Sequence, residues 1–272
     1  MKILLFKVGI LWSLYWLYII HNEVKAVNYS APIISGYRAA IGQFPWHVLL
    51  RRDADDELLC GGSIISTKWV LTAAHCIYNM TFVHLEFGTI NLYFDGLVMN
   101  STKFYIYPEY NHNSTNDIGL IELPEPLEFS VNINAIELIS AEEASTDLVG
   151  DLCTITGFGW TMNTGNNSQW LLYAEVDVIA NNICASAYHL ESIEDTAMCT
   201  EGYAGSSQTP CKGDSGGALV WKNEQFKRVQ VGVASFMMLN QCSEFPAGFT
   251  KVAKYLDFIY NITGINNQTD GK

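Results

Sequence analysis

The stretch Gly213-Asp214-Ser215-Gly216-Gly217 says more about fold and chemistry than any other part of this 272-residue sequence. Glycine lets a chain turn tightly and lets another backbone approach it closely. In such a turn the N–H groups of Gly213 and Ser215 could point at one place, as stabilisation of a developing negative charge requires. Taken alone, a serine among glycines is most often an ordinary turn. A functional role for Ser215 therefore depends on residues elsewhere in the chain.

Two other blocks supply the missing chemical groups. They are Thr72-Ala73-Ala74-His75-Cys76 and Asn116-Asp117-Ile118-Gly119-Leu120. Peptide hydrolysis by a hydroxyl needs an imidazole that takes the proton and a buried carboxylate that holds the imidazole in one tautomer. A single histidine, or an aspartate after asparagine, is usually structural. The three blocks together, in the order His, Asp, Ser, indicate nucleophilic catalysis.

The rest of the chain indicates an all-β protein. Short segments rich in β-branched and aromatic residues are separated by Gly, Asn and Pro, a pattern typical of a sandwich or a barrel. Helical spacing of apolar residues is clear only in the tail, over residues 252–262. The segments that predict strands are 46–50, 62–65, 68–71, 102–107, 118–123, 152–157, 175–179, 217–221 and 230–236.

From about Ile33 to Ile262 the sequence resembles the chymotrypsin–trypsin family of serine endopeptidases. The resemblance implies two packed antiparallel six-stranded β-barrels and a C-terminal helix. The N-terminal barrel would extend to about residue 140 and the C-terminal barrel would begin at about residue 150, with the site in the cleft between them. The motifs that carry the resemblance are Phe44-Pro45-Trp46, Cys60-Gly61-Gly62-Ser63, Leu71 to Cys76, Asp117 to Leu123, Gly157-Phe158-Gly159, Gly213 to Gly217, and Pro246 with Thr250.

Carried over by position, the resemblance assigns a role to each residue of the site. His75 becomes the general base and then the general acid, and Asp117 orients it. Ser215 becomes the nucleophile, and the N–H groups of Gly213 and Ser215 form the oxyanion hole. Ser235 matches the serine that supports the buried aspartate and pairs with the substrate backbone.

The residues at the specificity pocket depart from the common family patterns. Thr209 stands at the base, where relatives that cleave after Arg or Lys carry Asp. Met237 and Ala247 stand at two wall positions that must be glycine to admit an aromatic ring. A few methylenes change selectivity by roughly 1–3 kcal/mol. We therefore expect an elastase-like preference for small or medium apolar residues before the cut.

The seven cysteines fit an exported protein, with one thiol left over. The family pattern pairs Cys60 with Cys76, Cys184 with Cys199, and Cys211 with Cys242. Relatives often pair the position of Cys153 with a cysteine where this chain has Trp221. We therefore expect Cys153 to be a free thiol, buried and inert rather than bridged to another molecule.

The N-terminus predicts secretion and processing. Residues 1–26 have the layout of a signal peptide, although a retained membrane anchor is an alternative. Residues 27–32 form a short propeptide, so Ile33 would become the new N-terminus and pair with Asp214. The preceding Ala31-Pro32 excludes an activating cut after Arg or Lys. Residues 263–272 form a polar tail, and sequons for N-glycosylation begin at Asn28, Asn79, Asn100, Asn113, Asn166, Asn261 and Asn267.

Composition limits the partners. Hydrophobic residues make up 49% and charged residues 16%, which suits a folded protein rather than long disordered tracts. A net charge of -13 disfavours nucleic acid and anionic membranes as partners.

We expect protein or peptide substrates, protein protease inhibitors as further partners, and a secreted monomer without cofactor. The loop after Gly88 lacks the paired acids of the family's calcium site, so no metal is expected. The main alternative is a secreted non-catalytic homologue that acts as a binding protein.

Overall fold

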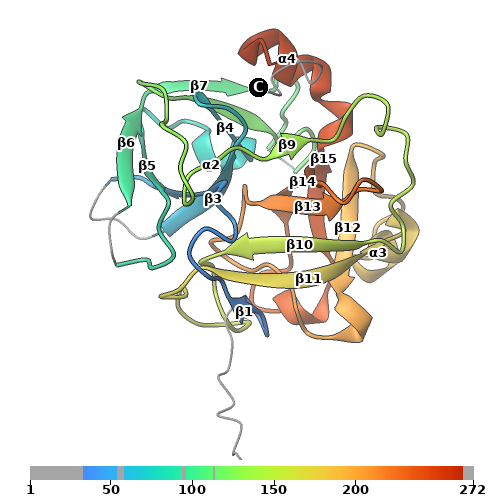
Figure 1. Cartoon of the computed structure of the whole chain (residues 1–272). Helices are drawn as coiled ribbons and strands as arrows, with labels where there is room; N and C mark the ends of the chain where they lie inside the picture. The colour runs from blue at the N-terminus through green and yellow to red at the C-terminus, as the bar shows by residue number, and fades with distance from the viewer. Residues whose placement is uncertain (1–32, 54–57, 94–95, 113, 266–272) are drawn as a thin grey trace, which may run out of the picture. The chain divides into compact units, whose positions relative to one another are not determined.

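The structure is a computed structural model that describes residues 33–53, 58–93, 96–112 and 114–265. The predicted signal peptide, the propeptide and most of the polar tail lie outside these ranges, as do Asn28, Asn113 and Asn267. The described part is mostly β, with two sheets that lie side by side in Figure 1 and a helix near the C-terminal end. None of its helices is long and apolar enough to cross a lipid bilayer.

The first sheet is built from the N-terminal half of the described chain and has the order β6-β5-β2-β3-β4-β8-β7. Only Thr102 separates β6 from β7, so the two ends of this order are joined by the chain itself and the sheet forms a half-barrel. Its strands are β2 (His47–Arg51), β3 (Leu58–Ile64), β4 (Trp69–Thr72), β5 (Val83–Phe87), β6 (Leu97–Ser101), β7 (Lys103–Ile106) and β8 (Gly119–Glu122).

The second sheet is a closed six-stranded barrel of β10, β11, β12, β13, β14 and β15, because β11 pairs both with β10 and with β12. Short strands β1 and β9 join it at β11 and β14. The prediction of an all-β fold built from two barrel-like sheets is therefore confirmed, although only the second sheet is a closed six-stranded barrel and the first is a half-barrel. The strands are β1 (Tyr37–Arg38), β9 (Glu137–Leu138), β10 (Leu152–Gly157), β11 (Leu172–Ile179), β12 (Ala197–Gly202), β13 (Ala218–Lys222), β14 (Arg228–Phe236) and β15 (Ala247–Lys251).

In the described ranges, helices are few and short. The predicted helical tail is a 3₁₀ turn, η3 (Val252–Lys254), followed by α4 (Leu256–Thr263). Tyr255 interrupts it with non-helical angles, and Gly264 ends α4 in the left-handed region at φ 69°. The other helical elements are α2 (Ala74–Ile77), α3 (Asn181–Ala187), η1 (Tyr203–Gly205) and η2 (Cys242–Glu244).

Every segment that predicts a strand coincides with one, within a few residues at its ends. The strand β5 was harder to predict because His84 and Glu86 interrupt its apolar character. Both side chains are nevertheless buried: Arg51 Nε donates to Glu86 Oε1 at 2.7 Å, and His84 Nδ1 lies 2.9 Å from Asn100 Oδ1. A buried ion pair thus replaces apolar packing in this strand.

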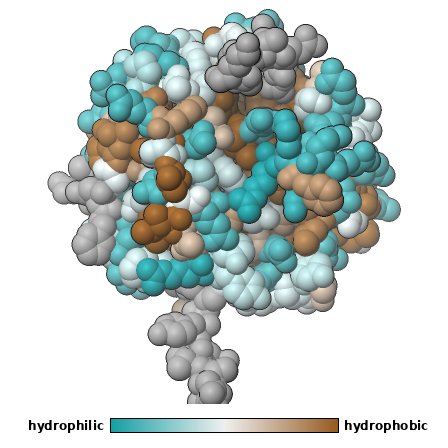
Figure 2. Space-filling view, viewed as in Figure 1, coloured by the Kyte–Doolittle hydropathy of each residue, from teal (hydrophilic) through white to brown (hydrophobic). Residues whose placement is uncertain are grey.

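The two sheets share one large hydrophobic core and meet through close backbone contacts. A methyl group added at Gly61 on β3 would lie only 3.4 Å from Gly217 Cα, and Ser63 Oγ donates to Gln230 Oε1 at 2.7 Å. On the face shown in Figure 2, hydrophobic residues form small separate groups among hydrophilic ones. Most of the buried hydrophobic residues belong to the one core that the two sheets share.

The three disulfides join the cysteines that the family pattern pairs: Cys60–Cys76, Cys184–Cys199 and Cys211–Cys242. Cys153 is free and only 1% exposed, and it lies opposite Trp221 across β10 and β13. Burial raises the pKa of the Cys153 thiol to about 12. Such a thiol stays protonated at neutral pH and reacts slowly.

Candidate active site

His75 and Asp117 are brought together by neighbouring strands of the first sheet. β4 leads into α2, which carries His75, and β8 follows directly after Asp117; Thr72 and Gly119 are opposite each other in the ladder. His75 Nδ1 lies 2.7 Å from Asp117 Oδ2, and the His75 backbone N–H donates to Asp117 Oδ1 at 2.9 Å. In a neutral imidazole that donates from Nδ1, Nε2 is the acceptor, so this contact favours the tautomer that a general base needs.

The second barrel completes the surroundings of Asp117. Ser235, on β14, donates from Oγ to Asp117 Oδ2 at 2.6 Å. Thr250, on β15, donates from Oγ1 to the Asp117 carbonyl at 2.8 Å. Asp117 is only 1% exposed, so the bonds from Ser235 and His75 satisfy a carboxylate that water does not reach, while Thr250 satisfies its backbone carbonyl. Its position depends on both sheets.

Ser215 lies in the turn that precedes β13. Gly213 and Gly216 have φ of +101° and +80°, which side chains other than glycine rarely adopt. A methyl group at Gly216 would also overlap Thr72 Oγ1 and the Gly61 carbonyl. The Gly61 N–H donates to the Ser215 carbonyl at 2.7 Å and ties this turn to β3 of the first sheet. The glycines are therefore required by backbone angle and by close approach.

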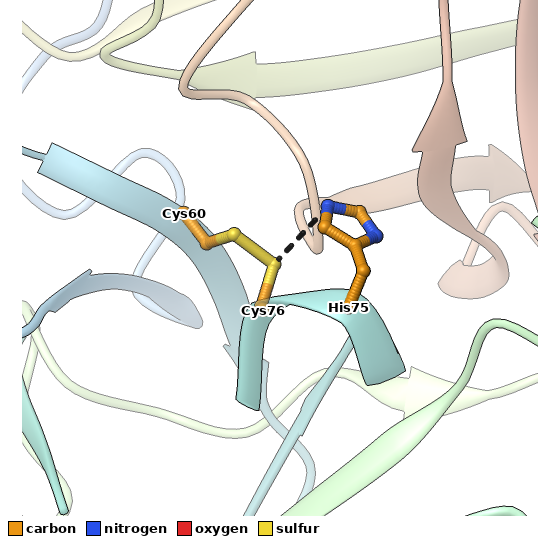
Figure 3. Close-up of side chains that lie close together, drawn as sticks. All are labelled: Cys60, His75 and Cys76. Atoms are coloured by element: carbon orange, nitrogen blue, oxygen red, sulfur yellow. Dashed lines mark hydrogen bonds between the residues drawn. A yellow bond between two sulfur atoms is a disulfide. The ribbon is translucent and has the colours of Figure 1, made fainter. Parts of the chain in front are cut away.

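A pocket of about 400 Å³ contains His75, Asp117 and Ser215 in its wall. Among the residues that the structure describes, no hydrogen bond joins the side chains of Ser215 and His75, and His75 Nε2 lies 3.6 Å from Cys76 Sγ (Figure 3). Catalytic hydrogen bonds are often long in unliganded sites. The full lining is Leu59, His75, Tyr110, His112, Ser114, Asp117, Lys212, Gly213, Ser215, Ser235, Phe236, Met237 and Leu239.

Cys60, His75 and Cys76 bring potential metal ligands close together, but they do not form a metal centre. Figure 3 shows the two sulfurs bonded to each other. Metals bind the cysteine thiolate, which a disulfide does not offer. His75 also already uses Nδ1 toward Asp117.

Asp214, beside the nucleophile candidate, is a buried carboxylate with two hydrogen-bond donors. It is 2% exposed and accepts from the Gly159 N–H at 2.7 Å and the Cys211 N–H at 2.9 Å. Burial outweighs these donors and raises the pKa of Asp214 to about 7. Ile33, fully buried, lines the same small cavity. Within the described ranges no Lys or Arg forms an ion pair with Asp214.

The predicted specificity residues do not all lie in this pocket. Met237 lines it and packs on the Cys211–Cys242 disulfide. Thr209 and Ala247 are 5% and 1% exposed and are not part of its lining. The ring of Phe236 lies so close to Gly248 that an added methyl group there would overlap it.

The lining includes residues that the sequence did not single out. Tyr110 and His112 contribute two rings that contact each other and Tyr78, with Tyr78 and His112 centroids 4.3 Å apart. Lys212 contributes a cation. Its place directly before Gly213 was a usable signal, whereas nothing in the sequence marks the rings.

Comparisons with known proteins agree with this geometry. The family model described as Trypsin matches residues 33–259. The chain is 35% identical to a collagenase from Hypoderma lineatum over 86% of this chain and 88% of the relative. It is 31% identical to a chymotrypsin from Phaedon cochleariae, covering 86% and 83% of the two chains, and 32% identical to a brachyurin from Leptuca pugilator, covering 86% and 99%. The solved structure of HL collagenase superimposes with a TM-score of 0.76 at 34% identity, covering 86% of this chain and 99% of that one.

Proposed function

This chain belongs to the trypsin family of serine proteases, and on that premise we propose that it is a secreted serine endopeptidase that works through Ser215, His75 and Asp117. The observation that carries the proposal is the arrangement around Asp117. His75 and Ser235 converge on its carboxylate at 2.7 and 2.6 Å, and Ser215 faces the same pocket. Membership of the family implies protein substrates.

In the proposed reaction Ser215 Oγ attacks the carbonyl carbon of the peptide bond while His75 Nε2 takes its proton. The carbonyl oxygen becomes negative and accepts hydrogen bonds from the Gly213 and Ser215 N–H groups. Asp117 stabilises the imidazolium that forms and holds the ring in one orientation. His75 then gives the proton to the leaving amine, which leaves an acyl group on Ser215. Water, activated by His75, releases the acid and restores the serine.

We propose that a cut between Pro32 and Ile33 completes the site. The new α-ammonium of Ile33 would then pair with Asp214, whose carboxylate lies beside Ile33 in a shared cavity. The ammonium would supply an opposite charge to the buried Asp214 carboxylate and so offset the free-energy cost of burying it unpaired. N-terminal sequencing of the mature protein tests this proposal; a start at any residue other than Ile33 contradicts it.

The preference for small or medium apolar residues remains a proposal that rests on Thr209, Met237 and Ala247. Met237 lines the pocket, where its side chain takes up space that a glycine would leave open, and Thr209 has no charge to pair with Arg or Lys. Turnover of p-nitroanilides with Ala, Leu, Phe or Arg before the cut measures the preference. Fastest turnover on Phe or Arg contradicts it.

Secretion and glycosylation are supported by three disulfides and by exposed sequon asparagines. Of the sequons in the described ranges, Asn79, Asn100, Asn166 and Asn261 are all exposed. Mass spectrometry of the secreted protein, before and after enzymatic removal of N-glycans, identifies the occupied sites.

One experiment separates the proposed enzyme from a non-catalytic binding homologue. A fluorophosphonate probe is incubated with the processed protein and with Ser215→Ala. Labelling that disappears in Ser215→Ala supports the enzyme, because only an activated serine reacts. Processed protein that starts at Ile33 and takes no label supports the binding protein.

A further inference from the structure

Lys212 gives the wall of the catalytic pocket a single strong cation. It is exposed and is the one lysine or arginine among the lining residues of this pocket. The other titratable groups in the wall are His75, Tyr110, His112 and Asp117. The Asp117 carboxylate is occupied by His75 and Ser235 and is 1% exposed, so it does not neutralise Lys212.

The lysine is held in place without a carboxylate partner. Its backbone carbonyl accepts from the Trp160 N–H at 2.8 Å, and its Nζ lies 4.8 Å from the centroid of the Trp160 ring. Trp160 is in turn packed on the Cys211–Cys242 disulfide. No Asp or Glu of the described residues forms an ion pair with Lys212. A cation–π contact orients the ammonium and leaves its donors free.

We propose that Lys212 binds an acidic side chain of the substrate, Asp or Glu, within about three residues of the cleaved bond. The lysine side chain is a flexible four-carbon stem with a point charge at its end, so its ammonium can reach a carboxylate at one or two neighbouring substrate positions. It directly precedes Gly213, so a substrate at Ser215 passes within reach of it. The inference rests on the proposed endopeptidase function and adds a substrate class to it.

The negative net charge of the chain should confine the preference for acidic residues to the substrate positions that reach Lys212. At -13 the molecule as a whole repels acidic peptides, and this repulsion acts over about 10 Å at 0.1 M salt. Attraction at Lys212 therefore opposes the long-range field. We expect acidic residues to be favoured only at the one or two positions that reach Lys212 and to be neutral or unfavourable elsewhere in the peptide.

The test uses the processed protein, with active sites counted by fluorophosphonate titration, and internally quenched peptides. One flanking position at a time carries Glu, Gln or Lys, and kcat/KM is measured for each peptide. An exposed ion pair is worth 0.2–1 kcal/mol, so Glu should exceed Gln by roughly 1.4- to 5-fold at one or two positions. Lys212→Gln should bring this ratio to about one, and Lys212→Glu should favour the Lys peptide. The Glu preference should also shrink in 1 M NaCl, where charges are screened within about 3 Å.

Lys222→Glu is the matched control. Lys222 is exposed, its Nζ also lies over a ring, at 5.0 Å from the Phe226 centroid, and it is not part of the pocket wall. The same charge change there should leave the Glu-to-Gln ratio intact. An unchanged ratio in Lys212→Glu, or an equal change in Lys222→Glu, overturns the inference about Lys212. Absence of both labelling and turnover in every protein instead overturns the proposed function.

Discussion

Replacing Asp214 by Asn in the uncleaved chain should remove a pH-dependent loss of stability of about 2–3 kcal/mol between pH 5 and pH 8. Asp214 is buried, accepts only two backbone N–H groups and has no cationic partner among the described side chains. Burial therefore raises its pKa from an ordinary value of 3.8 to about 7.

The free energy of unfolding falls as pH rises, because the folded chain binds the Asp214 proton more tightly than the unfolded chain does. A raised pKa means that the folded chain keeps the Asp214 proton to higher pH than the unfolded chain does. The stability from this group is fully present below pH 3.8 and is lost as pH rises through 7. With these two pKa values the loss is about 2 kcal/mol at pH 5 and about 4 kcal/mol at pH 8.

Urea unfolding of the uncleaved chain measures this effect, in a Ser215→Ala background that prevents self-cleavage. Asn keeps one oxygen acceptor but leaves one N–H, from Gly159 or Cys211, without its partner. That costs about 1–3 kcal/mol at every pH. The informative quantity is therefore the change in unfolding free energy from pH 5 to pH 8, compared between Asp214→Asn and its parent.

After cleavage before Ile33, we expect Asp214→Asn to destabilise the protein at neutral pH instead of removing a pH-dependent loss of stability. The free α-ammonium has an ordinary pKa of about 7.7–8.0 and would pair with Asp214, so the carboxylate would no longer be unpaired. In the cleaved protein Asp214→Asn should be destabilising near neutral pH by about 3–5 kcal/mol. Parallel pH curves for Asp214→Asn and its parent in the uncleaved chain would refute the reasoning, because the carboxylate would then not be the group that titrates.

Three further predictions concern the site and its surroundings. Asp117→Asn should lower kcat about 10⁴-fold, because the amide no longer holds His75 in the tautomer that a general base needs. Steady-state kinetics of both proteins on the same substrate measures this loss of kcat. Cys153 should react with a thiol reagent only after unfolding, because burial raises its pKa to about 12; prompt reaction in the folded protein, or no free thiol after denaturation, would contradict this. Gly248→Ala should lower stability by about 1–3 kcal/mol because its methyl group would overlap the Phe236 ring, and Phe236→Ala should recover part of that loss in a double-mutant cycle measured by urea unfolding.

Much of the fold is visible in the sequence because strands are local. Short segments rich in β-branched and aromatic residues, bounded by Gly, Asn and Pro, located β10 to the residue and other strands within a few positions. Sheet order, in contrast, depends on partners far apart in sequence. The ladder between β11 and β12, which closes the second barrel, joins Val176 to Gly202 across a helix and a loop. No local pattern encodes that pairing, so a sandwich and a barrel remained equally compatible with the segments.

For the site, the sequence by itself determined the chemical groups: a hydroxyl at Ser215 between glycines, an imidazole at His75 and a carboxylate at Asp117. The tertiary structure decided what surrounds them. Two strands of one sheet place His75 on Asp117, while Ser235 arrives from the other sheet. Which side chains enclose the pocket depends on where loops of both sheets meet, so Tyr110 and His112 became visible only in three dimensions. The physical reason is that reactive groups are fixed by residue type, whereas burial, charge and access are set by packing between residues distant in sequence.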